Sequence, residues 1–179
     1  MKALVTLASL LALTSVAAAE SYDATQPAPK ANTYVALDST IIVQRSISGG
    51  FGLSGGMRLS DTPLFARAAV AAGVAGSEGR WQQARVGVEA RGCVAREWVC
   101  AFGGVDAGYQ HDHVIDDLLF TDQMHETNAH DLLFVPRAGF ELGKQLKLRS
   151  SIELPYSIRL DEREQVAGIA LTAGLAGSF

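Results

Sequence analysis

All four histidines of the chain lie in one short segment, as His111, His113, His125 and His130. The same segment, 111–131, carries six Asp or Glu residues and no Lys or Arg. Imidazole nitrogens and carboxylate oxygens bind zinc, copper and nickel, so the segment could gather one divalent transition metal ion. No compact metal-ligand spacing is present, and a solvated acidic loop is the simpler interpretation. Both hypotheses stay open on the sequence alone.

Eleven charged side chains form a second group of candidate functional residues. All of them lie on the same face of segments in which residue types alternate with period two. Seven are positive and four are negative, so they could neutralise one another if they were enclosed together. An enclosed path for protons or ions is the alternative use of such a set. The residues are Arg58, Arg67, Arg85, Glu89, Arg91, Asp106, Arg137, Glu141, Lys147, Arg149 and Glu153.

The first residues have the organisation of a secretory signal peptide, 1–19. Lys2 provides the positive start, an apolar run follows, and three alanines, 17–19, form a small-residue cleavage site. A membrane anchor is less favoured, because the apolar run is short for a span. Residues 20–31 are polar and Pro-rich, which indicates a flexible entry segment. The chain has a net charge of −4, which argues against nucleic acid as a partner.

The chain has two cysteines, Cys93 and Cys100. In an exported protein an even number of cysteines indicates a disulfide. The pair brackets a predicted turn and has the same parity, as a cross-strand disulfide requires. A reactive redox pair is the alternative, but its CxxC spacing is absent.

Period-2 alternation predicts the elements that position these residues. Seven runs alternate apolar residues with small or charged ones, and 33–43 is the only candidate for an eighth, with poorer alternation. The clearer runs are 46–59, 64–75, 81–93, 98–110, 132–143, 146–156 and a last run that ends at Phe179. We therefore predict an all-β domain, 32–179, with eight antiparallel strands.

Such a sheet can place its apolar face inside a soluble barrel or outside, against lipid. The charged face is rich in Gly, Ala and Ser, as a narrow lumen requires. Short connections alternate with longer ones, which include 38–45, 111–131 and 157–165. An Arg that faced lipid would cost about 2–4 kcal/mol at mid-bilayer. We therefore predict an up-and-down transmembrane barrel whose lumen is filled by an ion-pair network.

The last strand supports this interpretation. It places Ile169, Leu171, Ala173 and Leu175 on the face that Phe179 shares. Over roughly 33–179 the chain resembles the small eight-stranded outer-membrane barrels of Gram-negative bacteria, the OmpA/OmpX-like architecture. The resemblance implies location in the outer membrane, contact with its lipid, and recognition of Phe179 by the barrel assembly machinery.

For function the sequence favours a structural or surface-interaction role, with the acidic, His-containing segment 111–131 as the contact site and no partner identified. A secreted or periplasmic lipocalin-like barrel that binds an apolar ligand is the alternative. A lipid-modifying enzyme is not expected, because the histidines are confined to one loop and Ser157, the nearest serine at the rim, lies in another.

Overall fold

The computed structural model describes residues 32–44, 47–76, 79–94, 98–117, 124–160 and 164–179, and for 114–117 and 124–127 only the backbone. The predicted signal peptide, 1–19, and entry segment, 20–31, lie outside the described residues. Within the described ranges, no helix is long and apolar enough to cross a membrane.

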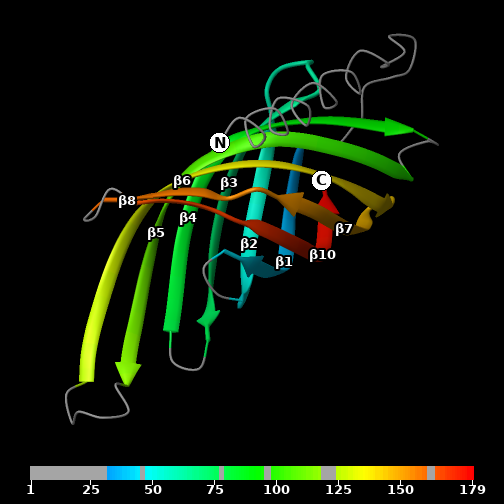
Figure 1. Cartoon of the computed structure of the whole chain (residues 1–179). Coiled ribbons are helices and arrows are strands. Elements are labelled where there is room, and N and C mark those ends of the chain that lie inside the picture. The colour runs from blue at the N-terminus through cyan, green and yellow to red at the C-terminus, as the bar shows by residue number, and fades with distance from the viewer. Residues whose placement is uncertain (1–31, 45–46, 77–78, 95–97, 118–123, 161–163) are drawn as a thin grey trace.

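The described elements are ten β-strands (Figure 1). They are β1 Thr33–Val43, β2 Ile47–Arg58, β3 Leu64–Ala75, β4 Gly79–Val94, β5 Val99–Asp117, β6 Met124–Gly143, β7 Leu146–Glu153, β8 Tyr156–Arg159, β9 Gln165–Ala167 and β10 Ile169–Ser178. Both β7 and β8 pair with β6, so they form one interrupted wall strand. β9 and β10 form another, because β9 pairs with β8 and β10 pairs with β7.

The wall is a closed, antiparallel barrel of eight strands. Neighbours in sequence pair from β1 to β6, and β10 pairs with β1 to close the ring. Tyr34 of β1, for example, lies opposite Gly56 of β2 on one side and Ser178 of β10 on the other. The all-β, eight-stranded prediction is confirmed, and so is the weaker assignment of 33–43 as a strand.

The carboxyl end of the chain takes part in the closure. The backbone N–H of Phe179 donates to the Thr33 carbonyl at 2.9 Å, and the Phe179 carbonyl accepts from Asn32 at 3.0 Å. Phe179 is 75% exposed. The final aromatic residue is therefore part of the wall, and its recognition by assembly machinery stays a prediction.

The interruptions in the last two wall strands lie side by side. Leu154 donates its backbone N–H to Pro136 of β6 at 2.9 Å, and Gly168 donates to Pro155 at 2.8 Å. Proline has no N–H to continue a ladder, so the regular pairing breaks at these positions. The wall remains continuous through the two bonds.

Three connections are shorter than predicted. Residues 38–43 belong to β1 and pair with β10 as far as Ile169, while β8 continues to Arg159 and β9 begins at Gln165. In the supposed loop 111–131, β5 continues to Asp117 and β6 starts at Met124. Pairing satisfies the backbone groups of a polar segment such as 111–117 as well as those of an apolar one, so composition did not predict the extension of β5. The β5–β6 hairpin consequently reaches beyond the other strands (Figure 1).

The two faces of the wall are the reverse of those in a soluble barrel. Val86 is 64% exposed on the outside, whereas its neighbour Arg85 is 7% exposed inside. Phe134 and Phe140 are likewise exposed, and Arg137 and Glu141 are buried. An apolar exterior around an ionised interior is the arrangement of a transmembrane barrel. The lipocalin-like alternative is therefore wrong.

Candidate functional site

Ten of the eleven charged residues assigned to the lumen are buried there: Arg67, Arg85, Glu89, Arg91, Asp106, Arg137, Glu141, Lys147, Arg149 and Glu153. Arg58 is the exception. It ends β2 beside the β2–β3 turn, is only half-buried, and its Nε donates to the Thr62 carbonyl at 2.9 Å. This position belongs to the mouth of the barrel rather than to its interior.

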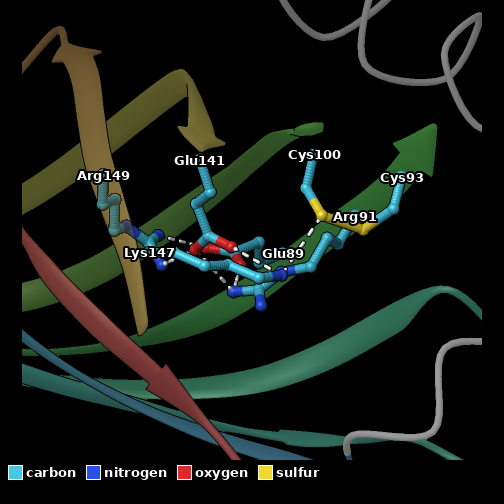
Figure 2. Close-up of a disulfide and its surroundings, with 7 residues drawn as sticks. All are labelled: Glu89, Arg91, Cys93, Cys100, Glu141, Lys147 and Arg149. Atoms are coloured by element: carbon cyan, nitrogen blue, oxygen red, sulfur yellow. Dashed lines mark hydrogen bonds and ion pairs between the residues drawn. A yellow bond between two sulfur atoms is a disulfide. The ribbon is translucent and has the colours of Figure 1, made fainter. Parts of the chain in front are cut away.

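Glu89 of β4 lies at the centre of the buried charges (Figure 2). Its Oε1 accepts a hydrogen bond from Nη2 of Arg91 at 2.9 Å. Its Oε2 accepts from Nη2 of Arg149 at 2.8 Å, from Arg137, and from the Tyr34 hydroxyl at 3.3 Å. Three guanidinium groups therefore share one carboxylate, as the enclosure of several charges requires.

Glu141 of β6 is a second acceptor beside Glu89 (Figure 2). Its Oε1 lies 2.9 Å from Nη1 of Arg149 and 3.2 Å from Nη2 of Arg91. Its Oε2 lies 3.5 Å from Nζ of Lys147. Arg149 and Arg91 thus join the two carboxylates, and the cluster connects β4, β6 and β7.

Two further acids extend the charged layer. Asp106 of β5 forms an ion pair with Arg67 of β3 and lies 3.5 Å from Nε of Arg137. Glu153 of β7 pairs with Arg85 of β4 at 2.6 Å. The Arg67–Asp106 and Arg85–Glu153 pairs join strands that are not neighbours in the wall, so their side chains occupy the space that a water channel would need.

Aromatic rings enclose the guanidinium groups. The Arg149 Cζ lies 3.9 Å from the ring centre of Phe102 and 5.1 Å from that of Tyr34. The Arg91 Cζ lies 4.2 Å from Tyr34 and 4.9 Å from Phe65. Such cation–π contacts favour a desolvated Arg over a Lys. These rings were not predicted as part of the site, although Phe65 and Phe102 share the parity of the charged residues in their strands.

Asp38 is a buried acid that was not predicted as part of the site, because 38–45 was assigned to a loop. It is 7% exposed in β1, and its Oδ2 accepts from the Ser54 hydroxyl at 3.2 Å. Its Oδ1 has no hydrogen-bond partner among the described residues. The continuation of β1 is what turns this carboxylate into the lumen.

The predicted disulfide is confirmed. Cys93 of β4 lies directly opposite Cys100 of β5, and the two are bonded. The bond sits at the end of the barrel that carries the β4–β5 turn, and the Lys147 ammonium lies 3.2 Å from the Cys100 sulfur (Figure 2). The disulfide therefore joins two strands next to the Glu141 ion pairs.

The histidines lie at the opposite end, where β5 and β6 leave the apolar band. His111 lies opposite His130 on the outer face, with ring centres 4.9 Å apart. His130 Nδ1 is hydrogen-bonded to the Tyr109 hydroxyl, and His113 Nδ1 is 3.0 Å from Oδ1 of Asn128. These residues form an outward-facing imidazole row on the hairpin.

The metal hypothesis depended on four imidazoles. The register pairs His125 with Asp116, but its side chain lies outside the described ones. Across the side chains that the structure describes, no three His, Cys, Asp or Glu groups are placed to hold a metal ion. The observed contact is a stacked pair, His111 and His130, supported by Tyr109.

Two carboxylates face inward at the same level as the imidazole row. Asp131 lies 3.4 Å from Nε of Arg159, while Asp112 accepts a hydrogen bond from Gln110 at 2.8 Å. Burial raises the pKa of Asp112; the Gln110 hydrogen bond opposes that rise, and the charge of Asp131 adds to it. At the rim, therefore, Asp131 is ion-paired, whereas burial of Asp112 favours its neutral, protonated form.

Ser157, the serine considered for catalysis, belongs to β8. It is buried, and its hydroxyl accepts a hydrogen bond from Nε2 of Gln44 at 2.9 Å. The hydroxyl thus serves as a bridge between two parts of the wall.

Comparison with known proteins reveals similarity of fold. No family model matches the chain, and neither does any curated protein sequence. The solved structure of Neisserial surface protein A (NspA) superposes with a TM-score of 0.62 at 14% identity, over 83% of this chain and 97% of that one.

Two other solved structures resemble the chain less closely. The N-terminal β-barrel domain of Pseudomonas aeruginosa OprF gives a TM-score of 0.49 at 12% identity, over 82% of this chain and 98% of the other. Ail, the attachment invasion locus protein of Yersinia pestis, gives 0.48 at 15% identity, over 80% and 95%. Together with the closed wall and its apolar exterior, the match to NspA establishes the small outer-membrane barrel architecture.

Proposed function

We propose that this small outer-membrane β-barrel is a plugged scaffold that holds its β5–β6 hairpin at the cell surface, where the hairpin contacts an external partner. The observation that carries the proposal is the unequal length of the strands. β5 and β6 have 19 and 20 residues, whereas β1 and β2 have 11 and 12. A strand needs about 9–11 residues to cross a bilayer, so the hairpin extends well beyond the membrane.

The direction of the hairpin supports its exposure outside the cell. It leaves the barrel at the end opposite Phe179 and the short β2–β3 and β6–β7 turns. In outer-membrane barrels the short turns face the periplasm and the longer segments face outward. The acidic and imidazole side chains of the hairpin then meet the external medium.

The lumen supports a scaffold rather than a pore. Glu89 and Glu141 are fully buried among Arg91, Arg137 and Arg149, so opening a path would separate several ion pairs in a medium where charges are poorly solvated. The bonded, buried hydroxyl of Ser157 likewise supports a scaffold rather than a lipid-modifying enzyme.

Site-specific labelling tests the orientation. A membrane-impermeant maleimide should label Asn128→Cys on intact cells, because Asn128 is exposed on the hairpin. Asp61→Cys, in the exposed β2–β3 turn, should be labelled only after lysis. The opposite pattern would refute the proposed orientation.

Two assays test the role itself. The purified protein should give no stepwise conductance in planar bilayers, and its expression should leave the mass of lipid A unchanged. Cells whose hairpin is shortened by replacing 114–127 with a two-residue turn should lose adherence to protein-coated surfaces while the barrel keeps its heat-modifiable gel mobility. Stable conductance, altered lipid A, or undiminished adherence would contradict a plugged surface scaffold.

A further inference from the structure

A groove of about 610 Å³ crosses the outer face of the barrel from β1 to β5. Its lining consists of Leu37, Phe51, Gly52, Leu53, Val70, Ala71, Ala72, Gln82, Gln83, Ala84, Tyr109 and His111. The register arranges the outward side chains in two adjacent rows across the strands. One row runs from Phe51 through Ala72 to Gln82 and His111, and the other from Leu53 through Val70 and Ala84 to Tyr109.

Small side chains create the hollow. Ala72 and Ala84 lie between larger residues, Phe51 and Val70 among them, so the wall recedes where they stand. The lining is overwhelmingly apolar toward β1 and β2. Hydrocarbon of the bilayer is the medium that meets this surface, and an extended acyl chain has the shape to fill it.

The end of the groove at β4 and β5 is polar. Gln82, Tyr109 and His111 line it, and the next position outward on β4 is the exposed Arg80. Arg80 lies opposite His113. We call Arg80, Gln82, His111, His113 and His130 the rim patch.

The rim patch favours an anion. Its side chains supply guanidinium, amide and imidazole N–H groups that lie together on one outward face of β4 and β5 and the adjoining edge of β6. The acids at this level, Asp112 and Asp131, belong to the inward face of the sheet and are partly or fully buried. Planar, charged donors such as Arg80 suit phosphate oxygens.

Because the apolar groove leads directly into the rim patch, we propose that the two together bind one lipid of the outer leaflet, a phosphorylated glycolipid of the lipid A class. One acyl chain lies along Phe51, Ala72 and Ala84, and a phosphate lies on Arg80 and the imidazole row. A free phosphate would leave the apolar part empty, and a neutral lipid would leave the donors unpaired. The site goes beyond the proposed scaffold role and does not depend on it.

Native mass spectrometry of the detergent-purified, full mature chain with added lipid A tests the proposal. The wild type should retain one lipid A, and lipid A stripped of its phosphates should bind about tenfold more weakly, as should the Arg80→Gln variant with intact lipid A. Lys144→Gln is the matched control, because Lys144 is an exposed cation at the other end of the barrel.

A second pair of variants tests the groove. Ala72→Leu fills the hollow and should weaken binding, whereas Ala68→Leu changes an outward alanine of β3 outside the groove and should not. Heat-modifiable mobility establishes that each variant is folded.

Three outcomes would overturn the proposal. These are equal binding by Ala72→Leu and Ala68→Leu, equal binding of the phosphorylated and dephosphorylated lipid, and a dimer mass in place of a protein–lipid complex. The last result would make the groove an interface between two copies of the chain.

Discussion

The Glu89 carboxylate of β4 accepts a hydrogen bond from the Arg149 guanidinium of β7 at 2.8 Å, across the lumen. In the wall β5 and β6 separate these two strands, and in sequence the residues are 60 positions apart. The contact therefore exists only when the barrel is closed. It links the stability of the ring to the pairing of charges in its centre.

Glu89→Gln should lower the free energy of unfolding by about 3–5 kcal/mol, because it leaves Arg91, Arg137 and Arg149 buried with one compensating charge fewer. Urea titration of the protein in lipid vesicles measures the effect. Asp61→Asn, in the exposed β2–β3 turn, is the control and should be nearly neutral. A loss below about 1 kcal/mol for Glu89→Gln would mean that water solvates these charges.

Gly56→Val should destabilise the barrel by about 1–3 kcal/mol through overpacking. A Cβ at Gly56 would lie 2.2 Å from Cε1 of Tyr34, whose ring is buried beneath Arg91. Gly49→Val on the same strand is the control, because nothing lies within 4 Å of a Cβ there. Equal stabilities of the two variants in vesicles would contradict a tightly filled lumen.

Val86→Arg should cost about 2–4 kcal/mol, and Val43→Arg about 0–1 kcal/mol, because the cost of a lipid-facing cation falls toward the interfaces. Val86 is exposed in the middle of β4, while Val43 is exposed at the end of β1. Unfolding in vesicles of defined thickness measures both. Identical costs at the two positions would contradict the placement of Val86 near the middle of the bilayer and of Val43 near its interface.

Replacement of both Cys93 and Cys100 by Ser should lower the free energy of unfolding by about 2–3 kcal/mol on the chain-entropy model, which applies to the short loop that the disulfide closes. Reductant should have the same effect on the wild type and none on the double variant. A wild type insensitive to reductant under unfolding conditions would contradict this contribution.

Asp112→Asn should stabilise the protein at neutral pH. Burial raises the pKa of Asp112, so the folded protein binds this proton more tightly than the unfolded chain does. The associated stability is present at low pH and is lost as the pH rises through the folded pKa. The advantage of Asp112→Asn should therefore shrink toward acidic pH.

Asp131→Asn is the matched comparison for Asp112→Asn. It removes the ion pair with Arg159, so it should be neutral or destabilising at neutral pH. A stabilising effect of both variants would mean that repulsion between the two acids outweighs the Arg159 ion pair. Urea titrations at neutral and acidic pH distinguish these results.

The facing of the strands was predictable because it depends on neighbouring residues. Arg85 and Val86 must point to opposite sides of any strand that contains both, and alternation over a dozen positions decides which side is apolar. The disulfide was predictable for the same reason, since Cys93 and Cys100 flank one turn. The extent of the strands was not predictable in the same way, because 111–117 has the composition of a loop and the alternation within 33–43 is too poor to show that 38–43 continues the strand.

By itself the sequence determined an antiparallel barrel with an apolar exterior, since period-2 patterning and the cost of exposing charge to lipid are properties of each strand alone. Only the tertiary structure decided that Glu89 meets Arg149, that Asp38 enters the lumen, and that small residues on three strands align into a groove. These relationships depend on register and closure, which join residues far apart in the chain. Alternation records which side a residue faces, but it does not record which residue it will meet there.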